Sequence, residues 1–442
     1  MNKLISMTLA AAMAVSFVGC GQTSEKGEES GEAKNLQTQE ESGQAKEADS
    51  NGSVDLMADI VVEKISYETQ LTKEQTVAAT DFYVRLFQQS FKEGENTLIS
   101  PLSVWTALAM TANGAKGETL AQMEKVFGMS VQDMNSYLNT YVNQLPEGEG
   151  YEFSMANGIW FKEDEKFFVE QDFLQFNANC YGADAYKAPF DDTTLTEINQ
   201  WVSDNTKGRV ENILDKINKD AVMYLVNALT FDGEWQNIYT DIQVQDGVFT
   251  MEDQTEKKVK LMYSDEQQYL EDEQAVGFLK YYKDKKYAFA ALLPNEGVSV
   301  SDFVSTLTGE RLNQILTDIQ ETKVKAAIPV FDCEYEEEMS DILTAMGMTD
   351  AFDGDLADFT GIGAYMDGNL VINRVLHKTY IAVDEKGTEA GAASAAEVAV
   401  VMSLDIPEMN QYVYLDRPFL YMIIDCETNL PVFMGTVMEI GE

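Results

Sequence analysis

The sequence predicts an α+β fold built around one large hydrophobic core, and three observations support this class. Hydrophobic residues make up 45% of the 442 residues and aromatic residues 10%, which is ample material for a core. Strand-like runs and helix-like segments follow one another without strict alternation, a pattern that favours α+β over a doubly wound α/β fold. From residue 59 to residue 442 the composition stays globular without an obvious linker. We therefore expect one domain over 59–442.

Helical periodicity is clearest near the start of this domain. Ala79, Phe82 and Leu86 have the spacing of one helix face. Apolar residues lie on nearly every side of residues 101–112, which is typical of a buried helix, and Ser100 is a favourable residue to precede it. Further helices are expected at 117–127, 130–144, 168–180 and 194–206, and strands at 152–161, 221–231, 286–293, 323–331, 370–383, 418–425 and 430–437.

The first residues indicate a targeting segment. Lys3 precedes an apolar run over 4–18, so we expect a secretory signal over residues 1–19. The end of this segment, Phe17-Val18-Gly19-Cys20, resembles a bacterial lipoprotein cleavage site. The resemblance implies that Cys20 is lipidated and that the mature protein is anchored on the outer face of the cytoplasmic membrane, at the cell surface. The alternative is a plain secretory signal with an incidental cysteine, and a protein that is secreted free.

Residues 20–58 have a different composition from the domain that follows. Between residues 21 and 55 there are nine acidic residues and three lysines, no aromatic residue, and only Leu36 and Val54 as sizeable aliphatic residues. Such a stretch cannot bury enough apolar surface to order itself. We expect the lipidated Cys20 to be followed by a disordered acidic tether that ends at residue 58.

The charge balance excludes two classes of partner. Acidic residues outnumber basic ones 75 to 31, for a formal net charge of −44. Nucleic acids and anionic membrane surfaces both require clustered Lys and Arg. We therefore expect no nucleic-acid partner, and contact with a membrane only through the lipid anchor.

Few residues support enzymatic or metal chemistry. His377 is the only histidine, so a two-histidine metal site is impossible, and no serine-hydrolase, phosphate-loop or zinc-protease motif occurs. We interpret His377 as a buried, hydrogen-bonded residue. The cysteines have no metal-ligand spacing, and we interpret the three in the domain as unpaired, buried small hydrophobic residues. No metal site and no cofactor are expected. The four cysteines are Cys20, Cys180, Cys333 and Cys426.

The segment from Gly387 to Val401 consists mostly of small residues, which on composition alone indicates a flexible linker. Its alternation indicates a strand. The parity that starts at Thr388 contains only small or β-branched uncharged residues, whereas Glu389 and Glu397 both fall on the other parity. This is the period-2 pattern of a strand with one buried face. Glycine and alanine are poor strand formers, so the segment is able to form a strand without being committed to one.

The stretch from Asp384 to Ala396 resembles the reactive-loop hinge of inhibitory serpins. It reads Asp-Glu-Lys-Gly-Thr-Glu-Ala-Gly-Ala-Ala-Ser-Ala-Ala. Other motifs resemble the same family and appear in its order over nearly all of residues 59–442. They are Ser100–Met110 with Asn113–Thr119, Asn157–Phe161, Trp201-Val202 with Thr206–Gly208, Leu225–Trp235, Leu376–Lys378, and Asp416–Tyr421 with Phe433–Thr436.

The resemblance implies a serpin fold with three β-sheets, about eight to nine helices, an exposed reactive-centre loop near residues 385–410, and a metastable native state. Serpins of the inhibitory type are suicide inhibitors of serine proteases, and sometimes of cysteine proteases. The protease cleaves the loop and is acylated, and the loop then inserts into the central sheet before the acyl bond is hydrolysed. Small residues on the inward parity suit rapid insertion. On this interpretation the chain is an inhibitor and not an enzyme.

The resemblance also assigns roles to particular residues. The polar cluster beneath the sheet, called the shutter, maps onto Ser100, Ser103, Asn227 and His377. Trp235 and Glu385 match the breach, where the loop first enters the sheet, although Val330 replaces the basic residue that often pairs with the hinge glutamate. The hinge residues are Glu385, Gly387, Thr388, Glu389, Ala390, Gly391, Ala392 and Ala393.

Counting 17 residues from Glu385 places the reactive bond between Val401 and Met402. The next candidate is Met402–Ser403, and the third is the bond before Val401. All three favour a serine protease with a small apolar primary pocket, such as an elastase. Many elastase-like proteases are basic, so we expect the negative charge of this chain to speed their encounter at low salt.

Two other functions stay open from the sequence. One is a non-inhibitory surface lipoprotein with the serpin fold that binds a ligand or partner. The other is an unrelated hydrolase or solute-binding lipoprotein, against which the missing catalytic motifs argue. For the protease inhibitor we expect a monomer.

Overall fold

A computed structural model describes residues 52–63, 65, 71–142, 148, 150–366, 368–388 and 410–441. All of them belong to one compact unit, Ser50–Glu442. The predicted signal, Cys20 and most of the predicted tether lie outside the described residues. Within the described part of the chain, no helix is both long and apolar enough to cross a membrane.

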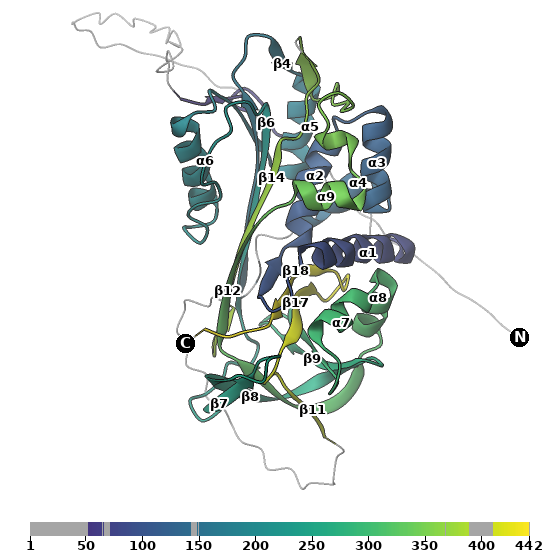
Figure 1. The fold of residues 1–442 in the computed structure, drawn as a ribbon, viewed down its shortest axis with the longest axis vertical. Coiled ribbons are helices and arrows are strands. Elements are labelled where there is room, and N and C mark those ends of the chain that lie inside the picture. The colour runs from purple at the N-terminus through teal and green to yellow at the C-terminus, as the bar shows by residue number, and fades with distance from the viewer. Residues whose placement is uncertain are drawn as a thin grey trace, which may run out of the picture. The chain divides into compact units, whose positions relative to one another are not determined.

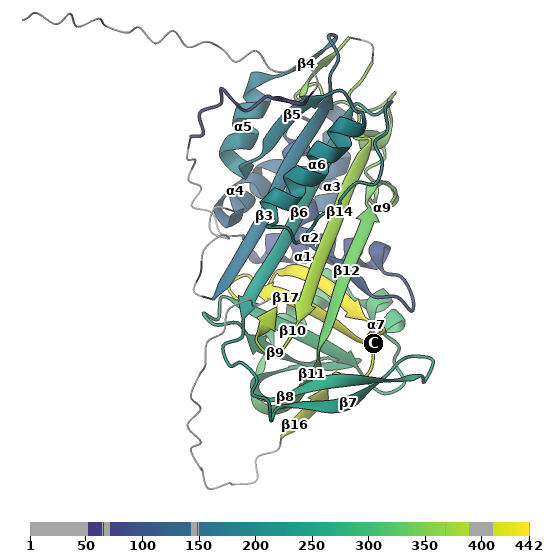
Figure 2. The same cartoon turned by 90° about the vertical axis from the view of Figure 1, so that its left-hand side faces the viewer.

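The central sheet has seven strands, and its middle strands run side by side in Figure 2. It is mixed, because β6 and β14 are parallel to each other whereas β3 is antiparallel to β6. In spatial order the strands are β1 (Val54–Asp55), β5 (Asp184–Ala188), β3 (Tyr151–Lys162), β6 (Met223–Glu234), β15 (Gly387–Thr388), β14 (Arg374–Val383) and β12 (Phe331–Glu338).

Two further sheets complete the β-structure of the described residues. The larger one runs in the order β16 (Gln411–Tyr414), β11 (Gln320–Pro329), β8 (Glu256–Glu271), β9 (Ala275–Tyr281), β10 (Tyr287–Pro294), β17 (Phe419–Asp425), β18 (Pro431–Val437) and β2 (Thr97–Ile99), with β7 (Val244–Thr250) paired to β8. The small one joins β4 (Phe167–Val169) and β13 (Gly363–Tyr365).

The helices cover both faces of the central sheet. α6 packs on one face, where Ile198 and Val202 share a hydrophobic cluster with side chains of β3 and β6, and α2 lies on the other (Figure 1). Ser100 caps α2, Pro101 opens it, and all of its residues are buried, as the sequence predicted. The helices are α1 (Lys73–Ser90), α2 (Pro101–Ala112), α3 (Gly117–Phe127), α4 (Val131–Val142), α5 (Gln171–Tyr181), α6 (Asp192–Asn205), α7 (Val300–Thr306), α8 (Gly309–Thr317), α9 (Ser340–Met346) and a 3₁₀ turn at Asp350–Phe352.

The predicted helix over 168–180 is wrong at its start. Residues Phe167–Val169 form a strand, and the helix α5 begins only at Gln171. The partner of this strand is Gly363–Tyr365, nearly two hundred residues away along the chain. Local helical spacing cannot reveal such a partner, and here the distant pairing decides the conformation.

The predicted tether extends too far. Val54 and Asp55 pair with β5 at the edge of the central sheet, and the amide of Leu56 donates to the carbonyl of Ala185 at 2.9 Å. The side chains of Leu56 and Met57 pack against the core. The folded domain therefore begins by residue 52. Leu56 and Met57, among polar neighbours, are enough to pack this segment against the edge of the sheet.

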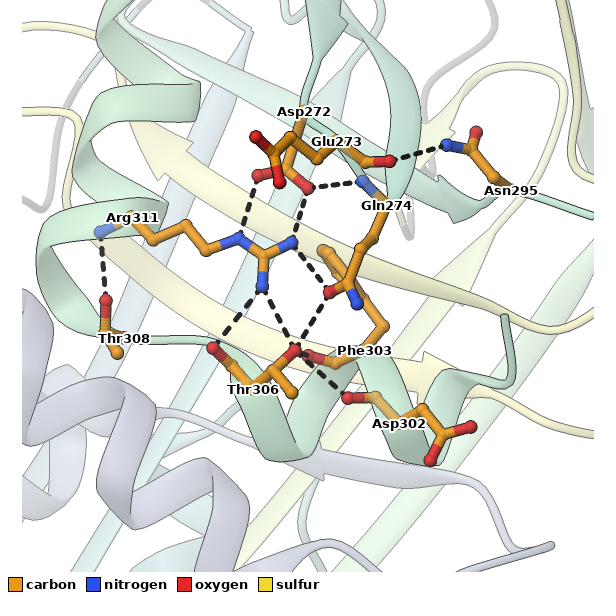
Figure 3. A network of polar contacts seen from close by, with 9 residues as sticks. All are labelled: Asp272, Glu273, Gln274, Asn295, Asp302, Phe303, Thr306, Thr308 and Arg311. Carbon is orange, nitrogen blue, oxygen red and sulfur yellow. Dashed lines mark hydrogen bonds and ion pairs between the residues drawn. The ribbon is translucent and has the colours of Figure 1, made fainter. Parts of the chain in front are cut away.

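A polar network fixes the pair of helices α7 and α8 against the turn between β8 and β9 (Figure 3). The Arg311 guanidinium bonds both carboxylate oxygens of Asp272, with one contact at 2.8 Å, and donates to Gln274 and Thr306. These contacts lower the pKa of the Asp272 carboxyl. The guanidinium also lies over the ring of Phe303. The network uses the fixed fork of arginine to join three separate segments.

Candidate functional site: the opening of the central sheet

The two middle strands of the central sheet pair directly over only part of their length. β6 and β14 are in register from Tyr224 with Arg374 to Ala228 with Lys378. Beyond that point they are joined through β15, which is antiparallel to both of them. Gly387 and Thr388 of the predicted hinge therefore already lie in the sheet, between β6 and β14.

A tight turn returns the chain from β14 into the sheet. The amide of Asp384 donates to the carbonyl of Gly387 at 2.9 Å. The Asp384 carboxylate accepts hydrogen bonds from the amides of Lys386 at 2.8 Å and of Gly387 at 3.1 Å. Aspartate commonly stabilises turns by bonding backbone amides two or three residues ahead. Asp384 thus closes the turn that aims Thr388 at the gap between the two strands.

Only glycine fits at position 387. A Cβ placed there would lie 1.8 Å from the carbonyl oxygen of Gly233 on β6 and 3.0 Å from the Cα of Glu234. The first of these separations is far inside van der Waals contact. The hinge backbone therefore approaches β6 more closely than any other residue would allow.

Thr388 faces inward and is completely buried. Its hydroxyl lies 2.6 Å from the phenol oxygen of Tyr282. The ring of Tyr282 is stacked on the indole of Trp235, with centroids 4.6 Å apart and planes at 15°. Thr388 lies on the parity that the sequence predicted to face inward; Gly387 beside it is buried as well, so the alternation of the hinge stays a prediction.

The segment after β6 donates hydrogen bonds to the carbonyl groups of the hinge turn. Trp235 donates from its backbone amide to the carbonyl of Lys386 and from its indole to the carbonyl of Asp384, both at 2.9 Å. The amide of Tyr239 donates to the carbonyl of Glu385 at 2.8 Å. Three consecutive carbonyl groups of the hinge turn are therefore satisfied by one short segment of chain.

A buried ion pair lies beneath this segment. Lys280 is 2% exposed and its ammonium lies 3.0 Å from the carboxylate of Glu266. The ammonium also lies over the rings of Tyr239, at 4.2 Å from the centroid, and Trp235, at 5.4 Å. Burial lowers the pKa of Lys280, and the attraction of Glu266 offsets part of that effect. The pair and the two rings form a continuous packed support for the hinge turn.

The four residues that the resemblance grouped as a shutter lie together where β6 and β14 pair directly. His377 and Asn227 are neighbours across the strand pair. The amide of Ser100 donates to Nε2 of His377 at 3.0 Å, and the hydroxyl of Ser103 bonds the side chain of Asn227. Asn157 on β3 extends the cluster through its side-chain contact with Asn227. The cluster links the N-terminus of α2 to three strands of the central sheet.

His377 is held neutral. Burial lowers the pKa of its imidazole to about 3. Since Nε2 accepts a hydrogen bond, Nδ1 carries the proton, and this buried Nδ1 has no hydrogen-bond partner among the described residues. Among the described residues, no hydrogen bond joins a carboxylate or a serine hydroxyl to the imidazole in a triad arrangement, and we interpret His377 as a structural residue.

Comparison with known proteins identifies the fold. The family described as serpin (serine protease inhibitor) matches residues 77–440. The chain is a serpin. Serpin B10 of Rhinolophus ferrumequinum is 29% identical over 399 residues, which cover 83% of this chain and 98% of that protein. The predicted fold class is thereby confirmed: α+β with three sheets.

Solved serpins show which state this structure resembles. The thermophilic serpin tengpin in its native state has a TM-score of 0.83 and 44% identity, covering 88% of this chain and all of that one. Tengpin in its latent state has a TM-score of 0.74 and 42% identity, covering 85% of this chain and all of that one. The present serpin is therefore more similar to the native than to the latent arrangement.

Several predicted residues of this serpin lie outside the described part of the chain. Of the hinge residues, the structure describes Glu385, Gly387 and Thr388. Glu385 is half-buried, and valine stands at position 330, where the resemblance leads one to expect a basic partner for this glutamate. The other hinge residues, the reactive bond and the lipidation site lie outside the described residues. They are Glu389, Ala390, Gly391, Ala392, Ala393, Val401, Met402, Ser403 and Cys20.

Sequence reasoning missed three residues that contact the hinge or the shutter. Asn157 was only part of a strand motif, although it joins the polar cluster. Tyr282 directly follows β9 and Tyr239 lies in the loop between β6 and β7; neither has a distinguishing sequence pattern, and only the folded structure brings them to the hinge. No disulfide bond joins the described cysteines; Cys180 and Cys333 are buried, as predicted, but Cys426 is half-buried. No cluster of metal-ligating side chains occurs among the described residues.

Proposed function

We propose that this serpin is an inhibitor that traps serine proteases covalently by inserting its cleaved loop into the central sheet. One observation carries the proposal: Gly387 and Thr388 already pair with β6 and β14. A loop that continued along the same path would add a full strand between them. In such a strand each backbone amide and carbonyl gains a ladder partner, and the inward side chains are buried.

The composition of the loop supports insertion. Thr388 is fully buried at the start of the path. The residues that follow at alternate positions are Ala390, Ala392, Ser394 and Ala396, all small and uncharged. Small side chains need little space between separating strands, so they favour insertion that is faster than hydrolysis of the acyl bond. A serpin that only binds a ligand does not require this alternation.

The polar cluster gives the strands a means of parting. For a strand to enter over its full length, the direct pairing of β6 with β14 at Asn227 and His377 has to open. Polar side chains that bond one another and the start of α2 can exchange partners when the strands move. We propose that Ser100, Ser103, Asn227 and His377 act in this way.

We further propose that the target is an elastase-like serine protease and that the reactive bond is Val401–Met402. A valine before the bond fits a small apolar primary pocket and offers no charge to a trypsin-like one. We also propose that the protein is a monomer tethered to the cell surface through a lipid on Cys20. These assignments rest on the sequence of the loop and of the N-terminus.

The experiment mixes the full chain with neutrophil elastase and, separately, with trypsin, followed by denaturing electrophoresis. A band near the summed mass of chain and elastase, with mass spectrometry of the released peptide starting at Met402, is the expected result. Cleavage by elastase without a stable complex contradicts the trapping mechanism. A stable complex with trypsin alone contradicts the assigned specificity while leaving the trapping mechanism in place.

A further inference from the structure

The side chain of Thr388 makes a specific polar contact inside the sheet. Its hydroxyl and the Tyr282 phenol are 2.6 Å apart, and either oxygen is able to donate. Both residues are completely buried. A hydroxyl in such a place costs free energy unless a partner satisfies it. The pair therefore makes the position at 388 selective for a residue that bonds the phenol.

The ring of Tyr282 is held by residues outside the hinge. It stacks on Trp235 and meets Phe231 edge-on, with centroids 4.8 Å apart and planes at 78°. Its backbone bridges Trp235, and its amide donates to the carbonyl of Tyr287 at 3.0 Å. Burial raises the pKa of the phenol, so it stays protonated. These contacts fix the position of the Tyr282 hydroxyl, which faces the space between β6 and β14.

The strand opposite Thr388 leaves room for this ring. Thr388 is in register with Gly233 on β6. A Cβ at Gly233 would lie 2.7 Å from Cδ1 of Tyr282 and 2.6 Å from the ring of Phe231. Glycine at this position lets the aromatic ring reach across β6 to the inserted residue. The two glycines, Gly233 and Gly387, and the phenol together form a binding site for the hinge residue Thr388.

We propose that Tyr282 is a positioning residue of the trapping reaction. Its hydroxyl recognises Thr388 and so keeps Gly387 and Thr388 of the hinge in the sheet, between β6 and β14. The proposal rests on the inhibitory function proposed above. With Thr388 already in place, insertion after cleavage starts from a formed strand end and needs no search for the gap. A larger fraction of acylated protease is then trapped before it is hydrolysed.

The first test needs no protease. In the full chain, Tyr282→Phe keeps the ring stack but leaves the Thr388 hydroxyl buried without a partner. Amide hydrogen exchange of Lys386 and Gly387, which donate to Asp384, is expected to rise about 5- to 150-fold. The double variant Tyr282→Phe with Thr388→Val removes both polar groups, so its exchange is expected to return toward the wild-type rate.

A matched control is Tyr287→Phe. Tyr287 is buried in the same aromatic cluster, 5.8 Å from Phe231 between ring centroids, and no hydrogen bond among the described residues joins its phenol to the hinge. Exchange at Lys386 and Gly387 is expected to be unchanged in this variant. Unchanged exchange in Tyr282→Phe, or an equal rise in Tyr287→Phe, overturns the proposal.

The second test measures how many inhibitor molecules are consumed for each elastase molecule trapped. Tyr282→Phe is expected to raise this number at least about two-fold, since the start of insertion is lost, and the double variant is expected to restore it. If the wild-type chain traps no protease, the inhibitory function fails, and the exchange comparison still decides whether Tyr282 holds the hinge. Faster exchange in Tyr282→Phe with an unchanged trapping ratio overturns the role of Tyr282 in trapping.

Discussion

If the proposed trapping mechanism holds, substituting Thr388 by arginine is expected to turn this serpin into a substrate of the protease. The threonine side chain is completely buried between β6 and β14 and bonds Tyr282. Among the hydrogen bonds and ion pairs of the described residues, no acidic side chain contacts this site, so an arginine there has no ionic partner. An uncompensated buried charge costs about 3–5 kcal/mol. If insertion must bury the charge in its transition state, its rate falls about 10²- to 10⁴-fold.

The assay compares Thr388→Arg with Glu389→Arg, which introduces the same side chain on the other parity. Each variant is titrated against a fixed amount of elastase, and residual activity and the covalent complex are followed on a denaturing gel. Thr388→Arg is expected to be cleaved without forming a complex, whereas Glu389→Arg is expected to retain the complex because the period-2 pattern predicts that position 389 faces outward. Full inhibition by Thr388→Arg would refute the argument from parity and burial.

Three further predictions concern the surroundings of the hinge and the helices. Burial lowers the pKa of His377 to about 3, so below about pH 6.5 this histidine binds a proton in the unfolded chain but not in the folded one. The free energy of unfolding of the wild type, relative to that of His377→Gln, should therefore fall by about 2 kcal/mol between pH 7 and pH 5. Parallel pH profiles of the two proteins in urea unfolding would contradict this. Trp235→Phe, which loses the indole bond at 2.9 Å, should loosen the hinge turn by about 1 kcal/mol in amide exchange; wild-type protection would refute the assigned contact. Arg311→Lys, which loses the two-pronged contact with Asp272, should lower unfolding stability by about 1–3 kcal/mol without changing the trapping ratio; an unchanged unfolding midpoint would count against the network.

Sequence patterns predicted those elements whose conformation is set locally. The helix α2 has a cap, an initial proline and an apolar composition, and each of these acts within a few residues. The strand β8, Glu256–Glu271, gave no such signal. It is rich in charged residues because much of its length is half-exposed, and its pairing with β7, β9 and β11 stabilises it instead. Pairing of this kind depends on distant segments.

The hinge illustrates the same limit at the site. Alternation identified Thr388 as inward-facing, and it lies buried in the sheet. Alternation could not show that Gly387 and Thr388 alone of the described hinge residues form a strand, or that Tyr282 receives the threonine. Both facts depend on how closely three segments approach, including 1.8 Å from a would-be Cβ at Gly387 to β6. Close approach of this kind is a property of the packed structure. Its one trace in the sequence is the glycine at position 387, which by itself does not show what lies beside it.

The central claim is that the hinge pair Gly387–Thr388 is the beginning of a strand that forms completely after cleavage. The most direct measurement is the thermal unfolding temperature of the full chain before and after the loop is cut by a protease. The account predicts a rise of many degrees, since a strand added between β6 and β14 gains ladder hydrogen bonds and buries one face. An unfolding temperature that stays the same or falls after the cut would contradict insertion, and with it the inhibitory function.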